Sequence, residues 1–155
     1  MRGTPDTKHL INSIYLDHDE LEEWNRYLQE KYRTITENEV RVERYMMDDA
    51  EYVGIGYGSA SRVIRTAVDM AREQGIKLGL LRPITLFPFP GRIIAELPER
   101  GVKGILTVEM SNGQMVDDVN LALAGRMRSD FHGRMGGNVP SASELLAKFK
   151  DLYGV

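Results

Sequence analysis

The chain has 155 residues, of which 42% are hydrophobic and 28% are charged, with a formal net charge of −3 at pH 7. This composition fits one globular domain with its own core, and no Lys/Arg block is long enough for a nucleic-acid or polybasic membrane patch. The sequence contains no cysteine, which excludes disulfides, thiolate zinc sites and cysteine-ligated iron–sulfur clusters within this chain.

The N-terminal residues lack the apolar segment of a signal peptide, and no apolar run approaches the roughly 20 residues that span a bilayer. We therefore expect a cytoplasmic protein. Residues 1–14 are polar and turn-rich, so we expect a linker there.

The stretch 18–32 predicts a helix that can extend to 37, because Asp17 and Glu20 have N-cap and N3 spacing and apolar residues recur at helical intervals. Its outer side is highly charged, so the narrow apolar stripe of Leu21, Trp24 and Leu28 must pack on this domain or on a partner. The alternating residues of "NEVRVERYMM" then predict an edge strand or an extended connection.

Strands and helices alternate regularly in the rest of the chain. Short apolar runs at 52–57, 77–83 and 103–110 predict strands buried on both faces. Between them we expect a helix that ends at Gly75 and a short helix that Pro98 terminates. This order predicts an α/β fold with three layers, a mainly parallel sheet covered by helices on both faces.

The C-terminal part shows two capping-box spacings, each of which predicts a helix start. Ser111 and Gln114 precede one apolar helical pattern, and Ser141 and Glu144 precede the last. The segment "MRSDFHG" between these two helices predicts a last short strand.

Gly54, Gly56 and Gly58 stand between the first buried strand and its helix, where a phosphate cradle would lie. A dinucleotide fingerprint needs a third glycine, but a serine stands there, and the next strand ends without an acidic residue. We favour a structural role in which Gly56 and Gly58 permit the turn and Ser59 caps the helix. The alternative is a stand-alone nucleotide- or phosphate-binding module that uses the turn from Gly54 to Ser59.

Five further residues are candidates for an interface: Phe87, Phe89, Glu109, Gln114 and Arg134. The two phenylalanines lie between prolines, so they either fill the core or face a partner. Glu109 ends the third buried strand, where α/β sheets place ligands, although a capping or interface role is favoured. A capping role is also favoured for Gln114, and a solvated loop for Arg134. We identify no catalytic residue. We also identify no metal site, because His9, His18 and His132 lack the spacing of metal ligands.

Three segments resemble a known family: "YGSASRVIRTAVDMAREQGIKLGLLRPITLFPFP", "VEMSNGQMVDDVNLAL" and "GRMGGNVPSASELL". They are similar to the C-terminal part of the alpha subunit of 2-oxoacid:ferredoxin oxidoreductases, most of all the type that acts on 2-ketoisovalerate (3-methyl-2-oxobutanoate). The resemblance implies a fold like the transketolase C-terminal domain, in which one strand can be antiparallel.

The resemblance also implies an activity for the parent complex, the coenzyme A-dependent oxidative decarboxylation of a 2-oxoacid. That complex uses thiamine diphosphate with Mg, iron–sulfur clusters, coenzyme A and ferredoxin. The pyrimidine-binding domain is absent here, and the diphosphate-binding motif belongs to the beta subunit. We therefore expect residues 1–14 to link to a missing N-terminal domain and residues 15–155 to form the transketolase C-terminal-like domain.

This chain alone should be inactive and bind no cofactor by itself. Its expected role is assembly with the other subunits, and through the complex with ferredoxin.

Overall fold

The computed structural model describes residues 14–155 and contains a five-stranded sheet in the order β1-β3-β2-β4-β5. In chain order the elements are α1 (His18–Asn38), β1 (Val42–Tyr45), β2 (Tyr52–Ile55), α2 (Gly58–Glu73), β3 (Leu78–Pro83), α3 (Gly91–Ala95), β4 (Gly104–Glu109), α4 (Met115–Leu123), β5 (Asp130–Gly133) and α5 (Ala142–Tyr153). Every strand and helix expected from the sequence is present, although some begin at other residues.

The sheet is mainly parallel, as predicted. Strands β3, β2, β4 and β5 pair in parallel, and β1 runs antiparallel to β3 with Val42 opposite Pro83. The edge strand expected from "NEVRVERYMM" is therefore confirmed as the one antiparallel member of the described sheet.

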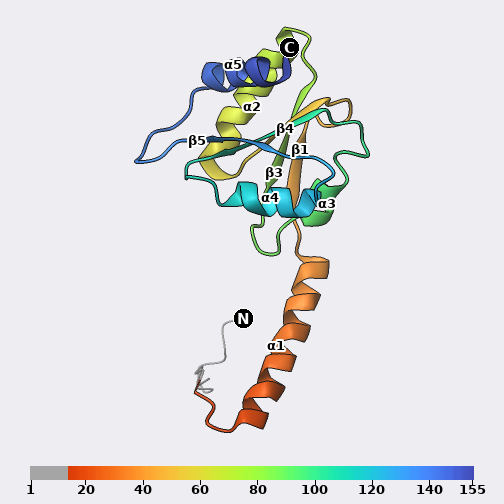
Figure 1. Ribbon diagram of the computed structural model, residues 1–155, viewed down its shortest axis with the longest axis vertical. Helices are drawn as coiled ribbons and strands as arrows, with labels where there is room; N and C mark the ends of the chain where they lie inside the picture. The colour runs from red at the N-terminus through yellow and green to blue at the C-terminus, as the bar shows by residue number, and fades with distance from the viewer. Residues whose placement is uncertain (1–13) are drawn as a thin grey trace, which may run out of the picture.

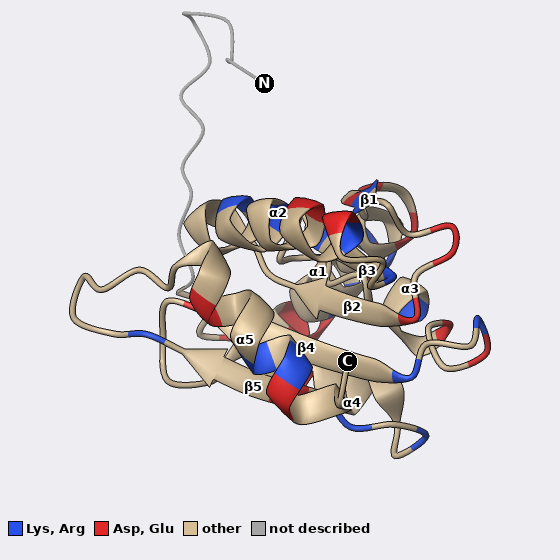
Figure 2. Cartoon of the chain, turned by 90° about the horizontal axis from the view of Figure 1, so that it is seen from above, with Lys and Arg blue, Asp and Glu red and all other residues tan. Residues whose placement is uncertain are grey.

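Helices cover both faces of the sheet, which confirms the three layers (Figures 1 and 2). Successive strand residues point to opposite faces, so neighbouring residues enter different cores. On one face Ile55 and Ile105 pack with α3 and α4, and on the other Leu80 and Leu106 pack with α2 and α5. In Figure 2 basic and acidic residues share the surface of α2, whereas β2 carries none. Burial on both faces explains the nearly continuous apolar character of these strands.

Helix α1 projects away from the rest of the molecule (Figure 1). It starts as predicted, because the Asp17 carboxylate accepts the backbone N–H groups of Asp19 and Glu20, both at 3.0 Å. It continues to Asn38, and none of its residues is buried. The apolar stripe of α1 is therefore not part of the hydrophobic core that surrounds the sheet.

The two predicted capping boxes have different outcomes. The box before α5 is confirmed, since Glu144 N–H donates to Ser141 Oγ at 3.1 Å and Ser141 N–H donates to the Glu144 carboxylate at 3.3 Å. The box at Ser111 and Gln114 is wrong. Gln114 is itself the N-cap residue of α4, without a side-chain capping bond, and the Ser111 hydroxyl donates to Glu109 instead.

Two expectations concern residues that the structure does not describe. His9 and all but the last residue of the expected linker lie outside residues 14–155. Within the described range, no helix combines the length and the apolar character that a bilayer crossing requires.

Candidate functional site at the carboxyl edge of the sheet

The carboxyl ends of β2, β3, β4 and β5 meet at one edge of the sheet, since these strands are parallel. This is the edge at which open α/β sheets bind ligands and partners. Gly56, Gly58 and four of the five interface candidates lie in the segments that follow these strands, and Gly54 and Glu109 lie within β2 and at the end of β4. Strand β1 begins at the same edge, where Ile84 N–H donates to the carbonyl of Arg41 at 2.9 Å, so α1 also leads into it.

Glu109, the last residue of β4, is 1% exposed. Its carboxylate accepts four hydrogen bonds: from the Ser111 hydroxyl at 2.8 Å and from the backbone N–H groups of Gln114, Met115 and Val116 at 3.1, 3.1 and 2.9 Å. These three N–H groups are the unpaired donors at the start of α4. Glu109 therefore caps α4 from outside the helix and fixes the loop between them.

The hydrogen bonds decide the charge state of Glu109. Burial raises the pKa of this carboxyl, and the bonds from Met115, Ser111, Val116 and Gln114 lower it, with a net lowering from the ordinary value of 4.5. Donors that point at the charged form stabilise it, as does the positive end of the helix dipole. The carboxylate is thus ionised at neutral pH and engaged by its donors.

Gln114 and Arg134 lie beside Glu109 through their backbones. Arg134 N–H donates to the Glu109 carbonyl at 3.1 Å, while its guanidinium lies 3.8 Å from Glu144 with 45% of the side chain exposed. The Gln114 side chain is also exposed and makes no capping bond. The structure therefore brings three of the five candidates together, with the polar ends of two of them facing outward.

The two phenylalanines have different environments. Phe89 is half-buried against the core beneath α3 and α4, whereas Phe87 is 65% exposed. The Phe87 ring meets Tyr32 of α1 edge-on, with centroids 5.9 Å apart. Of the two roles left open by the sequence, Phe89 fills the core and Phe87 faces outward.

Exposed apolar side chains follow every one of the four parallel strands. They are Tyr57 after β2, Ile84, Leu86 and Phe87 after β3, Met110 after β4, and Met135 and Val139 after β5. Exposed apolar groups gathered at one end of a fold are typical of a protein interaction surface. Apart from Phe87, these residues were missed by the sequence analysis, although large apolar residues in the loops directly after strands are a usable signal.

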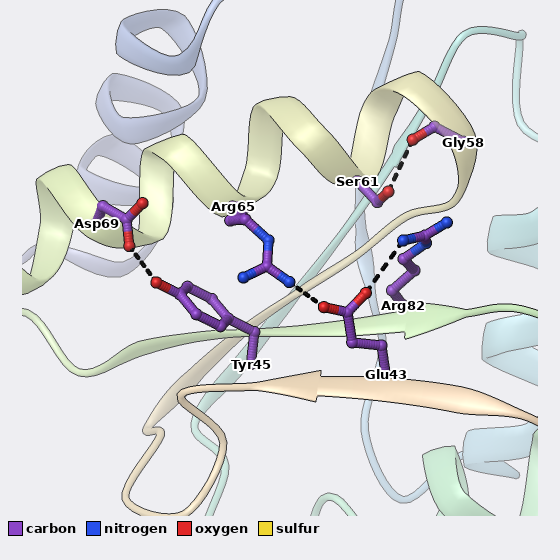
Figure 3. A network of polar contacts seen from close by, with 7 residues as sticks. All are labelled: Glu43, Tyr45, Gly58, Ser61, Arg65, Asp69 and Arg82. Carbon is purple, nitrogen blue, oxygen red and sulfur yellow. Dashed lines mark hydrogen bonds and ion pairs between the residues drawn. The ribbon is translucent and has the colours of Figure 1, made fainter.

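The glycine turn is explained by packing. A Cβ on Gly54 or Gly56 would lie 2.5 Å from the side chain of Ile64, so the bare backbone lets α2 approach β2. Gly58 has φ +55° and is the first residue of α2. The expected cap by Ser59 is wrong, because Tyr57 is the N-cap residue and makes no side-chain bond, while Ser59 is exposed. The Ser61 hydroxyl instead donates to the Gly58 carbonyl at 2.7 Å (Figure 3).

We expect the Gly54→Ala variant to lose about 1–3 kcal/mol of unfolding free energy, because the added methyl overlaps Ile64 in a packed core. Gly101→Ala is the comparison, since a Cβ there meets no atom within 4 Å and only its positive φ opposes the change. Urea unfolding of both variants gives the difference. An unchanged Gly54→Ala variant would remove the packing explanation for this glycine.

A polar network joins β1 to α2 and β3 (Figure 3). The Glu43 carboxylate binds both Arg65 and Arg82, the latter at 3.1 Å. The Tyr45 hydroxyl donates to Asp69 at 2.6 Å, which raises the pKa of Tyr45, and the Arg65 guanidinium lies 3.9 Å from the centre of the Tyr45 ring. The network fastens the edge strand β1 to α2 and β3.

The residues from 14 to 155 include no group of three or more His, Asp or Glu side chains arranged to hold a metal ion. His18 is the exposed first residue of α1, and His132 Nε2 lies 3.1 Å from Glu144. The structure thus places these two histidines at separate sites.

Comparison with known proteins identifies the family. The model of the pyruvate:ferredoxin oxidoreductase core domain II matches residues 50–145, which include the four parallel strands. Ketoisovalerate oxidoreductase subunit VorB of Methanothermobacter marburgensis is 53% identical over 95% of this chain and 41% of its own length. 2-Oxoglutarate synthase subunit KorA of the same organism is 37% identical over 70% of this chain and 29% of its own.

A solved structure shares the fold. The 2-oxoglutarate:ferredoxin oxidoreductase of Magnetococcus marinus superposes with a TM-score of 0.72 at 17% identity, covering 97% of this chain and 27% of that one. The present chain spans about two fifths of the length of its VorB relatives. Because the family model covers more than half of the sequence, the chain belongs to the pyruvate:ferredoxin oxidoreductase core domain II family.

Proposed function

We propose that this chain is the non-catalytic assembly domain of a ferredoxin-dependent, coenzyme A-acylating 2-oxoacid oxidoreductase. The identity of 53% to a ketoisovalerate oxidoreductase subunit supports 2-ketoisovalerate as the substrate of the complex. The domain comprises residues 15–155, and residues 1–14 connect it to a further domain. The observation that carries the docking role is the row of exposed apolar side chains after all four parallel strands.

The composition of the edge loops supports docking. Residues 84–90 and 110–114 contain no charged side chain, whereas 28% of the whole chain is charged. Depletion of charge with enrichment of aromatic residues and Met is the compositional signature of an interface centre. The buried hydrogen bonds of Glu109 hold one of these loops in place, so little conformational freedom is lost on docking.

The described groups fit a structural role better than a catalytic one. Among the described residues, Glu109 is the one ionisable side chain that is buried. Its two carboxylate oxygens already accept four hydrogen bonds, so it is poorly suited to serve as a general base. The sequence also offers no thiolate for an iron–sulfur cluster. We therefore assign thiamine diphosphate with Mg, the clusters, coenzyme A and the ferredoxin contact to the rest of the complex.

Reconstitution tests this assignment. The chain is co-expressed with the remaining subunits, and ferredoxin reduction is measured with 2-ketoisovalerate and coenzyme A. We expect activity only when both parts are present. Ferredoxin reduction by the isolated chain, or tight thiamine diphosphate binding to it in calorimetry, would contradict the proposal. NAD(P)-dependent protection of the Gly56 to Ser61 amides in NMR would instead favour a nucleotide-binding module.

A further inference from the structure

Asn112 and Gly113 form an Asn-Gly pair in the loop between β4 and α4. Of the six asparagines in the sequence, Asn112 alone precedes a glycine. Its side chain is exposed, and no described residue forms a hydrogen bond with the side-chain amide. The Gly113 backbone N–H likewise has no acceptor among residues 14–155. Both the amide carbon of Asn112 and the nitrogen that follows it are therefore free to react.

These two groups can react with each other. When the Gly113 nitrogen loses its proton, it can attack the side-chain carbonyl carbon of Asn112. The new C–N bond closes a cyclic imide, and the bond to the amide NH₂ breaks and releases ammonia. Water then adds to either carbonyl of the ring and leaves an aspartate or an isoaspartate, whose peptide bond runs through the side chain. Glycine favours the attack, because it has no Cβ to obstruct the approach.

The other described asparagines lack this combination. Three of them lie in α1 or α4, where the next backbone N–H is bonded to a helix carbonyl: Asn25, Asn38 and Asn120. Asn138 lies in an exposed loop at the same edge of the sheet, but its side chain donates to the Met135 carbonyl at 3.2 Å. The branched side chain of Val139 also crowds the nitrogen that would attack. Asn138 is therefore the matched comparison for Asn112.

The position of Asn112 gives the reaction a consequence. Residues 110–114 contain no charged side chain and belong to the proposed docking edge. An aspartate at position 112 would be ionised at neutral pH and would place a charge where interface centres are depleted of charge. An isoaspartate would also add a methylene to the backbone just before the three N–H groups that Glu109 binds, which disturbs the start of α4.

We propose that Asn112 is a modification site at which the chain deamidates spontaneously, with water as the co-reactant, and that the product docks more weakly onto the other subunits. The reaction requires no partner and no cofactor. Only its effect on docking rests on the proposed function.

Peptide mapping of the aged full chain by mass spectrometry tests the reaction. The purified protein is incubated at mildly alkaline pH, where the backbone nitrogen loses its proton more readily, and the conversion of each asparagine is followed. We expect Asn112 to convert on the order of tenfold faster than Asn138, which corresponds to about 1.4 kcal/mol of activation free energy. The Asn112→Gln variant should stay unmodified at this position, because its longer side chain disfavours ring closure. Equal rates at Asn112 and Asn138 would overturn the proposal.

Calorimetric titration against the remaining subunits tests the effect on docking. Ageing of the native chain and the Asn112→Asp variant should each raise the dissociation constant on the order of tenfold. Asn25→Asp makes the same exchange at an exposed position in the first half of α1 and should leave the affinity unchanged. Ageing should not weaken binding by the Asn112→Gln variant.

Phe87→Asp distinguishes failure of this inference from failure of the proposed function. If Phe87→Asp weakens docking but Asn112→Asp and ageing do not, the effect assigned to the modification is wrong. If none of the three weakens docking, the docking edge itself is wrong and the effect on docking is refuted with it, whereas deamidation seen by mass spectrometry stands.

Discussion

The Glu109→Ala variant is expected to lose about 3–5 kcal/mol of unfolding free energy, among the largest effects of any single substitution here. The change removes a carboxylate that accepts three backbone N–H groups and one hydroxyl. Those donors then remain at the start of α4 without an acceptor, in a region from which water is largely excluded. Urea unfolding followed by circular dichroism measures the loss.

Two comparisons separate the capping role from a general effect of the substitution. Glu96→Ala removes an exposed carboxylate and should change stability by less than about 0.5 kcal/mol. Glu109→Gln keeps the shape but removes the charge and turns an NH₂ group toward backbone donors, so it should lose about 1.5–3 kcal/mol. Equal stabilities for Glu109→Ala and Glu96→Ala would mean that the carboxylate does not hold α4.

The same interaction predicts a pH dependence. Because the pKa of Glu109 is lower in the folded chain than its ordinary value of 4.5, its contribution to stability is fully present above pH 4.5. The contribution is lost as the pH falls from there through the folded pKa. The native chain should therefore lose stability more steeply than Glu109→Ala in this acidic range, and parallel curves would contradict the assignment.

The features that follow from local pattern were predictable from the sequence. Asp17 and Ser141 cap their helices through neighbouring residues, and the period of the apolar residues distinguishes strands from helices. The capping role favoured for Glu109 is confirmed, although the local pattern also predicted a capping box at Ser111 and Gln114 that is absent. Glu109 is a strand residue that becomes available only because the chain turns directly from β4 into the helix, so it replaces the local capping box.

For the candidate site residues, too, the neighbouring sequence predicted some roles, and only the packing of distant elements showed the others. The sequence identified Phe87 and Phe89 as a pair, but only packing against α3 and α4 shows that Phe89 is the one directed into the core. The assignment of Ser59 as a cap assumed that a serine after a glycine begins the helix. The helix already begins at Gly58 with Tyr57 as its N-cap residue, so Ser59 lies within the first turn.

Phe87 is the residue whose substitution should most weaken assembly. It is 65% exposed at the centre of the loop that follows β3, and aromatic anchors of this kind are typical hot spots of interfaces. We expect Phe87→Asp to raise the dissociation constant for the remaining subunits at least about 30-fold, which corresponds to about 2 kcal/mol. Calorimetric titration of the chain against those subunits measures the change.

Leu121→Asp is the matched control for Phe87→Asp. Leu121 is 79% exposed on α4, outside the edge loops, so the same charge placed there should leave the affinity unchanged. Within the chain, Phe87 has one described ring contact, with Tyr32, and its replacement should therefore lower stability by no more than about 1 kcal/mol. A large loss of affinity with little loss of stability would assign Phe87 to docking. Equal affinities for the two variants would remove the carboxyl edge as the assembly surface, whatever the reconstituted complex catalyses.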